Sequence, residues 1–231
     1  MNILTIIGTP RKGNTRALND LFKAELADEG DTLDEIVLPR DFGDICCGCT
    51  SCILHGEEKC PHRDRIAPLI ERLEKADLII LATPVFVMSC SSAMKAFLDH
   101  LAFMWLVHRP REAFFNKTAL VIAAAAGSGV GDTVKLMKKN LFYLGVPQVF
   151  DYGITAIKMG GNYEESPRKE TIKRQVSAKA ARVKRAAARP RVGLKTRLFF
   201  NIFRIAQKKG WNKLDADYWC EKGWLDGKKP F

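Results

Sequence analysis

The first 155 or so residues alternate between short apolar runs and longer stretches in which apolar residues recur at helical spacing. Continuous apolar runs are typical of strands buried on both faces of a parallel sheet, and the 3.6-residue spacing is typical of the helices that cover it. We therefore predict an α/β domain. The predicted strands are 2–7, 32–38, 77–83, 118–124 and 148–154. The predicted helices are 15–29, 66–75, 91–105 and 132–144.

The order of these elements favours one topology. Because strand–helix–strand crossovers are right-handed, five such strands favour a three-layer, doubly wound, five-stranded parallel sheet of the flavodoxin-like order 2-1-3-4-5. Residues 39–63 do not follow the alternation and contain five of the seven cysteines. Long loops inside a compact domain are usually functional. We predict that the domain comprises residues 1–160.

Residues 161–231 have a different pattern and are predicted to form a second unit, a helical basic extension with an aromatic tail. The stretch 167–188 spaces Ile172, Val176 and Val183 along one narrow apolar stripe, with Lys and Arg elsewhere. This pattern predicts an amphipathic helix. A second amphipathic stretch spans 194–209, and the tail 211–231 holds three of the four tryptophans.

The net charge of +11 is concentrated in this extension. Residues 168–213 contain 16 Lys or Arg and one acidic residue, whereas residues 1–167 contain 18 Lys or Arg and 21 Asp or Glu. A basic amphipathic helix can pack on its own domain or in a dimer, lie on an anionic membrane, or bind nucleic acid. We favour packing, because exposing the aromatic tail to water would be costly. Peripheral membrane contact through 168–213 is the second alternative, and nucleic-acid binding is disfavoured because no helix-turn-helix or stacking platform is present.

The loop 8–15 (GTPRKGNT) joins the first strand to the first helix, at the sheet edge where α/β proteins bind ligands. Backbone N–H groups at a helix N-terminus bind phosphate, and hydroxyl, amide and guanidinium groups add hydrogen bonds. The loop is neither a Walker A motif nor GxGxxG, which favours a monophosphate over a triphosphate or dinucleotide. The candidate phosphate ligands are Thr9, Arg11, Gly13, Asn14 and Thr15.

Two segments, GTPRKGNTRAL at 8–18 and TPVFVMSCSSAMKAFLDHL at 83–101, resemble the NADPH-dependent FMN reductase family, in the family's order and separation. The resemblance covers residues 1 to about 155. It implies FMN as cofactor, NAD(P)H or a reduced carrier as electron donor, and a small-molecule or protein electron acceptor. It also implies a homo-oligomer in which neighbouring subunits help to form the site.

The resemblance also assigns two flavin loops. In that family the turn after the third strand borders the isoalloxazine ring, and a glycine-rich loop after the fourth strand covers the other side, so that backbone amides bind the flavin's polar edge. This chain departs from the family at Phe86, where Tyr is usual, and at Val87-Met88, which replaces Phe-Gly. The implied flavin contacts are Thr83, Pro84, Val85, Phe86, Val87, Gly127, Ser128 and Gly131. We interpret Met88, Cys90 and Met94 as packing residues.

Cys46, Cys49, Cys52 and Cys60 follow the spacing C-x2-C-x2-C-x7-C. Cysteines at steps of three can surround one compact cubane, whereas structural zinc more often uses two separated C-x2-C pairs. The arrangement resembles the iron-sulfur flavoproteins, which bind a [4Fe-4S] cluster through a compact cysteine motif. A loop without a metal is the alternative. His55 and His62 flank the loop and are expected at the surface.

Together these features predict an NAD(P)H-dependent FMN oxidoreductase. We identify no catalytic acid or base, because hydride transfer to a flavin depends on positioning. The alternative is a non-enzymatic flavodoxin-like electron carrier or a membrane-docked redox adaptor. No apolar run approaches the roughly 20 residues of a membrane-spanning helix, and the N-terminus lacks signal-peptide features. We therefore expect a cytoplasmic, reducing location.

Overall fold

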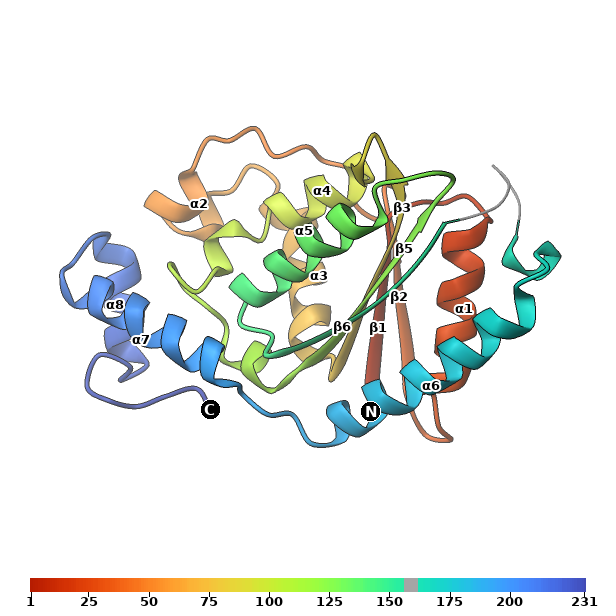
Figure 1. Cartoon of the computed structure of the whole chain (residues 1–231). Coiled ribbons are helices and arrows are strands. Elements are labelled where there is room, and N and C mark those ends of the chain that lie inside the picture. The colour runs from red at the N-terminus through yellow and green to blue at the C-terminus, as the bar shows by residue number, and fades with distance from the viewer. Residues whose placement is uncertain (156–161) are drawn as a thin grey trace.

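The predicted strands form one parallel sheet in the computed structural model, which describes residues 1–155 and 162–231 (Figure 1). The strands of the parallel path are β1 (Asn2–Ile7), β2 (Thr32–Val37), β3 (Leu78–Phe86), β5 (Thr118–Ala125) and β6 (Gln148–Thr155). Their order, β2-β1-β3-β5-β6, confirms the predicted topology. One further strand, β4 (Ser89–Cys90), was not predicted, and it pairs antiparallel with the end of β3.

Helices cover both faces of this sheet (Figure 1). Because side chains alternate along a strand, Ile3 and Ile7 of β1 pack on one side and Leu4 and Ile6 on the other. The Ile3 side is covered by α1 (Asn14–Leu26) and α6 (Lys169–Ala188). The opposite side is covered by α3 (Arg63–Lys75), α4 (Ser92–Asp99) and α5 (Val130–Tyr143). The predicted helix 91–105 is shorter than expected, because the chain tightens into a 3₁₀ turn at Ala102–Met104.

Helix α6 is part of the main core. Its narrow stripe, Ile172, Val176, Ala180 and Val183, is buried with Leu18 and the other apolar residues of the α1 face. The packing that the sequence analysis favoured is therefore confirmed for this helix. The predicted domain boundary at residues 160 and 161 lies outside the described residues.

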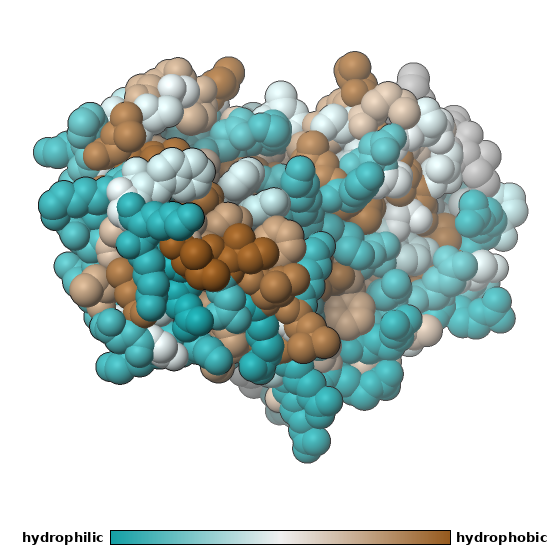
Figure 2. All heavy atoms as spheres, turned by 60° about the vertical axis from the view of Figure 1, so that its left-hand side comes forward, coloured by the Kyte–Doolittle hydropathy of each residue, from teal (hydrophilic) through white to brown (hydrophobic). Residues whose placement is uncertain are grey.

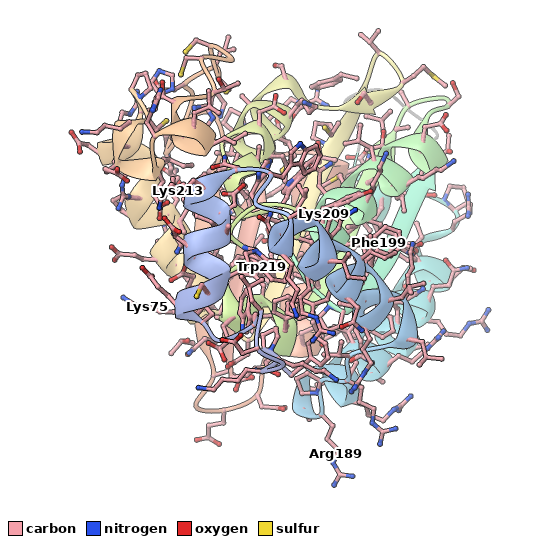
Figure 3. The ribbon with its side chains drawn as sticks, turned by 90° about the vertical axis from the view of Figure 1, so that its left-hand side faces the viewer. Lys75, Arg189, Phe199, Lys209, Lys213 and Trp219 are labelled. Atoms are coloured by element: carbon pink, nitrogen blue, oxygen red, sulfur yellow. The ribbon has the colours of Figure 1, made fainter. Side chains whose placement is uncertain are left out.

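The last two helices of the chain, α7 (Leu194–Lys208) and α8 (Lys213–Glu221), form a second, smaller core at one end of the molecule. Trp219 points from α8 toward α7 (Figure 3) and stacks on Phe200 with ring centroids 4.8 Å apart. Trp224 and Phe115 complete this aromatic cluster, so α7 and α8 are anchored on the α/β domain. None of the helices in the described part of the chain is long and apolar enough to cross a membrane.

Candidate cofactor site and cysteine loop

The start of helix α1, at the carboxyl edge of the sheet, has features that favour the binding of an anion. Gly13 occupies the N-cap, no side chain caps the first turn, and that turn contains no acidic residue. The free N–H groups and the helix dipole both favour a negative charge there. A Cβ on Gly13 would lie 3.7 Å from the guanidinium of Arg11, so this cation is beside the helix start. The Thr9 hydroxyl accepts the backbone N–H of Arg11 at 3.2 Å and shapes the turn.

Asn14 is the first residue of α1, and Thr15 follows it as a buried residue of the first turn. The loop 8–15 packs tightly against the end of β3. A Cβ on Gly8 would lie 2.6 Å from Ser91 Oγ and 3.1 Å from Thr83 Oγ1, so a larger residue is excluded there. Each of the five predicted phosphate ligands therefore lies on this turn or on the first helical turn beside it.

Thr83 supports the neighbouring turn. It is fully buried, and its hydroxyl accepts the Ser91 N–H and donates to the Pro84 carbonyl, both at 3.0 Å. Val85 follows in β3 and pairs with Cys90 of β4. The Thr83 hydroxyl thus fixes the shape of the loop.

The hairpin between β3 and β4 turns at Val87 and Met88, whose φ angles are 48° and 63°. Two consecutive positive φ angles are typical of a type I′ turn, which usually contains Asn-Gly. Val87 is 99% exposed, and Phe86 and Met88 are also exposed. The interpretation of Met88 as a packing residue is therefore wrong, because the tight turn places it outside the core; Cys90 and Met94 are buried as expected.

The glycine-rich loop between β5 and α5 contacts this hairpin. Gly129 has φ +90°, and a Cβ there would lie 2.9 Å from Met88 Cα. The Ser128 hydroxyl donates to the Met88 sulfur at 3.3 Å. A Cβ on Gly127 or Gly131 would meet no atom within 4 Å, so both border open space. The structure thus brings the three predicted cofactor loops to one edge of the sheet.

The predicted cluster ligands lie in the loop that contains α2 (Ser51–Leu54). Cys46, Cys49, Cys52 and Cys60 are free thiols, and none is fully buried. Burial raises the pKa of Cys52, and the negative charges of Cys60, Cys46 and Cys49 raise this pKa further. The hydrogen bond from the Ser51 side chain lowers the pKa of Cys49. The charge effects on Cys52 indicate that the other three thiols lie in its neighbourhood.

Cys60 also lies beside two histidines. Within the described residues, the one group of three His, Cys or carboxylate ligand atoms lying within 4.8 Å of one another comprises Cys60, His62 and His100. His62 Nδ1 and His100 Nε2 are 2.8 Å apart, and His100 Nδ1 donates to the Ala96 carbonyl at 2.7 Å. His55 is exposed as expected, but His62 is half-buried because it turns toward His100. Sequence reasoning missed His100, which lies far along the chain in a helical pattern.

A buried ion pair connects the C-terminal helices to the cysteine loop. Asp215 of α8 is buried and pairs with the Arg109 guanidinium and with His108 Nδ1, the latter at 2.8 Å. The Arg109 guanidinium also donates to the backbone carbonyls of Cys52 and Ile53. Sequence analysis missed this contact, although Asp215 is the first acidic residue after Glu170 in a very basic segment.

A second set of charges holds the same loop. Arg111 pairs with Glu57 and, at 3.2 Å, with Glu74 of α3. Burial raises the pKa of Glu57, but the charge and hydrogen bond of Arg111 outweigh this effect, so the net pKa is below its usual value. Asn212 adds a hydrogen bond to the Ile53 carbonyl at 3.2 Å. The loop is thus fixed by the 109–111 segment, whose Arg111 also pairs with α3, and by the start of α8.

The sheet order and the three loops that meet at its carboxyl edge define a flavodoxin-like α/β protein. The sequence model of the NADPH-dependent FMN reductase family matches residues 1–158, and the chain belongs to this family. The predicted family is thereby confirmed.

Curated relatives share part of this sequence. An iron-sulfur flavoprotein of Archaeoglobus fulgidus is 30% identical over 128 residues, which cover 55% of this chain and 56% of that protein. An iron-sulfur flavoprotein of Methanocaldococcus jannaschii is 29% identical over 148 residues, which cover 62% of this chain and 72% of that protein. The first of these matches thus spans little more than half the length of the relative.

Solved structures share the fold. An FMN-dependent NADH-azoreductase of Bacillus anthracis, solved with FMN, has a TM-score of 0.61 and 14% identity and covers 80% of this chain and 100% of its own. An NAD(P)H:quinone oxidoreductase of Methanothermobacter marburgensis has a TM-score of 0.59 and 17% identity, and the match covers 81% of this chain and 94% of that one. At these identities the similarity shows a common architecture, in agreement with the strand order.

Proposed function

We propose that this protein is an FMN-dependent oxidoreductase that takes electrons from NAD(P)H or a reduced carrier and passes them to a small-molecule or protein acceptor. The observation that carries this proposal is the meeting of the phosphate loop, the β3–β4 hairpin and the glycine loop at one edge of the sheet. When bound, FMN supplies the hydride and electron chemistry, and the protein supplies binding and orientation.

The uncapped start of α1 fits the phosphate of FMN. Its free backbone N–H groups, the Asn14 amide and the adjacent Arg11 guanidinium are donors in a region without a first-turn acid. Thr9 and Thr15 contribute hydroxyl groups to the same turn. Together these groups would hold the phosphate and so fix the cofactor in the crevice.

The two other loops fit a flat aromatic ring. Phe86, Val87 and Met88 present exposed apolar surface, and Gly127 and Gly131 leave open space in which a ring can approach backbone amides. Excluding water from one face while leaving the other open would position a nicotinamide against the ring. A neighbouring subunit in a homo-oligomer would complete this enclosure.

The cysteine loop fits a [4Fe-4S] cluster by its donor chemistry. Three other thiols lie in the neighbourhood of Cys52, and the four sulfur atoms do not form the close set that a single ion requires. The proposed ligands are Cys46, Cys49, Cys52 and Cys60. Such a cluster, when bound, accepts and releases single electrons. The names of the two archaeal relatives support this assignment, and those of the solved structures favour quinones and azo compounds as acceptors.

Phosphate recognition can be tested with Asn14→Asp. An acidic residue at the first position of α1 favours the helix but repels a phosphate, so folding and binding are separated. We expect at least a tenfold weaker affinity for FMN and little change for riboflavin, which lacks the phosphate. Quenching of flavin fluorescence measures both. Equal weakening of the two ligands, or none for either, contradicts the proposed phosphate site.

The cluster can be tested by anaerobic purification with iron and sulfide analysis. We expect about four iron and four sulfide ions per chain, as for one cubane. The Cys49→Ser variant should lose this iron and sulfide. Cys47→Ser is the matched control, since Cys47 is an exposed thiol of the same loop outside the spacing. Equal loss in both variants, or no iron in the wild type, contradicts the proposed ligand set.

Turnover separates an enzyme from an electron carrier. The flavin-loaded protein is expected to oxidise NADH or NADPH with ferricyanide, a quinone or a nitroaromatic acceptor. Failure to oxidise either nucleotide with every acceptor would leave only the carrier function, while FMN affinity would still report on the site.

A further inference from the structure

Helix α7 has an apolar face on each side. The inner face, which includes Phe200, packs on the aromatic core. The outer face carries four aliphatic residues at steps of four, four and three, which keeps them in one stripe along the helix. They are Leu194, Leu198, Ile202 and Ile205, with 86%, 58%, 48% and 58% of each residue exposed. Nothing in the inner core explains this second apolar stripe.

Positive charge surrounds the stripe. Figure 2, in which the α7–α8 side comes forward, shows hydrophobic surface bordered by hydrophilic side chains. Residues 171–214 contain no Asp or Glu. Trp211, just beyond the end of α7, is 77% exposed. The basic residues between 189 and 213 are Arg189, Arg191, Lys195, Arg197, Arg204, Lys208, Lys209 and Lys213.

We propose that this outer face of α7 docks the protein on an anionic lipid bilayer. A helix with an apolar stripe flanked by Lys and Arg lies in the plane of a membrane surface, with its aliphatic side chains at the boundary between headgroups and acyl chains. Lys and Arg then meet the lipid phosphates, and an exposed tryptophan suits the interface. The opposite face of α7 keeps the helix attached to the α/β domain.

Charge complementarity favours lipid over the other partners. A symmetric dimer through this face would place the Lys and Arg around the stripe against their own copies, which is repulsive. A nucleic acid would match the charge but would leave the central aliphatic stripe without an apolar partner. An anionic bilayer satisfies both the charge and the apolar surface.

The test is co-sedimentation of the full chain with vesicles. We expect binding to vesicles of phosphatidylcholine and phosphatidylglycerol in equal parts, and at least tenfold weaker binding to phosphatidylcholine alone. High salt should weaken the binding, because the attraction to the surface is electrostatic. Tryptophan emission should shift to the blue on binding, and Trp211→Phe should lose most of this shift, since Trp219 and Trp224 are already buried and Trp105 packs against the main core.

Two variants divide the proposal into its parts. The double change Leu198→Asp/Ile202→Asp, at exposed positions, should reduce binding at least tenfold, and Lys208→Glu/Lys209→Glu should do the same through charge. Leu33→Asp is the control, because Leu33 is a similarly exposed aliphatic residue on the distant strand β2. If Leu198→Asp/Ile202→Asp does not fold, Lys208→Glu/Lys209→Glu and the emission of Trp211 still test the proposal.

Several results would overturn the proposal. One is the absence of vesicle binding, and another is equal binding of the wild type and the α7 variants. A concentration-dependent dimer that Leu198→Asp/Ile202→Asp abolishes, without vesicle binding, would assign the face to a second copy. Flavin affinity is measured separately, so a failure here is distinct from a failure of the proposed function.

Discussion

Val87 combines a left-handed backbone with a β-branched side chain, a pairing that folded proteins rarely adopt. Its side chain is almost fully exposed, so it makes little packing contact to offset the strain. Backbone strain of this kind clusters at ligand sites. The strain at Val87 therefore agrees with a role of the hairpin in forming the proposed flavin site.

We expect Val87→Gly to raise the free energy of unfolding by about 1 kcal/mol. Relief of strain contributes about 1–3 kcal/mol, and the greater backbone freedom of unfolded glycine removes about 0.5–1 kcal/mol of that gain. Chemical denaturation measures the change. Val87→Ala is the control and should give little gain, because it keeps a Cβ at the same φ; an equal gain from both would exclude relief of strain as the cause.

The buried carboxylate of Asp215 gives the second prediction at this scale. Asp215→Asn removes the nearer counter-charge of the buried Arg109 guanidinium, which then keeps only Glu57 at 3.7 Å, and should lower the free energy of unfolding by about 3–5 kcal/mol. It should also increase hydrogen exchange in the cysteine loop, because Arg109 holds the carbonyls of Cys52 and Ile53.

Asp217→Asn is the matched control for Asp215→Asn. Asp217 lies on the same helix in an exposed i,i+4 pair with Lys213. Surface pairs of this kind contribute about 0.3–0.5 kcal/mol. Similar losses of unfolding free energy in the two variants would show that α8 tolerates neither change. The loss in Asp215→Asn could then not be assigned to the ion pair with Arg109.

At the scale of elements, Lys117 joins the start of β5 to the end of α3. Its ammonium group donates to the carbonyls of Glu74 and Ala76, which are left open where the helix ends. Burial lowers the pKa of Lys117 to about 8, while nearby Asp77 and Glu74 act in the opposite direction. Because Lys117 is buried at this helix end, the free energy of unfolding is expected to change with pH in the alkaline range.

The sign of this dependence follows from proton linkage. Between pH 8 and about 10.4, the unfolded Lys117 binds more protons than the folded one, so stability rises with pH in this window. From pH 7 to 9.5 the gain from this group is about 2 kcal/mol. We expect Lys117→Met to lose this part of the pH profile in chemical denaturation. The exposed Lys135 provides the control, since Lys135→Met should keep the wild-type profile.

At the scale of the whole molecule, the basic segment consists of two helices with opposite roles. Val176 of α6 is fully buried, whereas Ile205 of α7 is exposed. Val176→Asp places a charge in the main core and should prevent folding or cost more than about 4 kcal/mol. Ile205→Asp should change the free energy of unfolding by less than about 0.5 kcal/mol. Equal sensitivity at the two positions would contradict the exposed face of α7.

Four of the five strands could be predicted to within one residue at each end, because a strand buried on both faces needs a continuous apolar run. Strand β3 instead continues to Phe86, through residues 84–86 that were predicted to lie in the turn after it. The turn at residues 8–15 could be predicted because glycine and polar residues stand directly between a strand pattern and a helix pattern. Strand β4 could not be predicted, since its two residues pair through a turn that Val87 and Met88 form only within the folded loop. The outward stripe of α7 could not be predicted either, because both faces of that helix are apolar.

The sequence by itself determined the strand order, the family and the candidate loops, because periodicity and short motifs are local properties of the chain. The tertiary structure decided which thiols and charges meet. His100 lies beside His62, and Asp215 holds Arg109 against the cysteine loop, through contacts between residues 38 and 106 positions apart. Such contacts depend on where helices end and which face they bury, and these are set by packing of the whole chain rather than by the residues around each site.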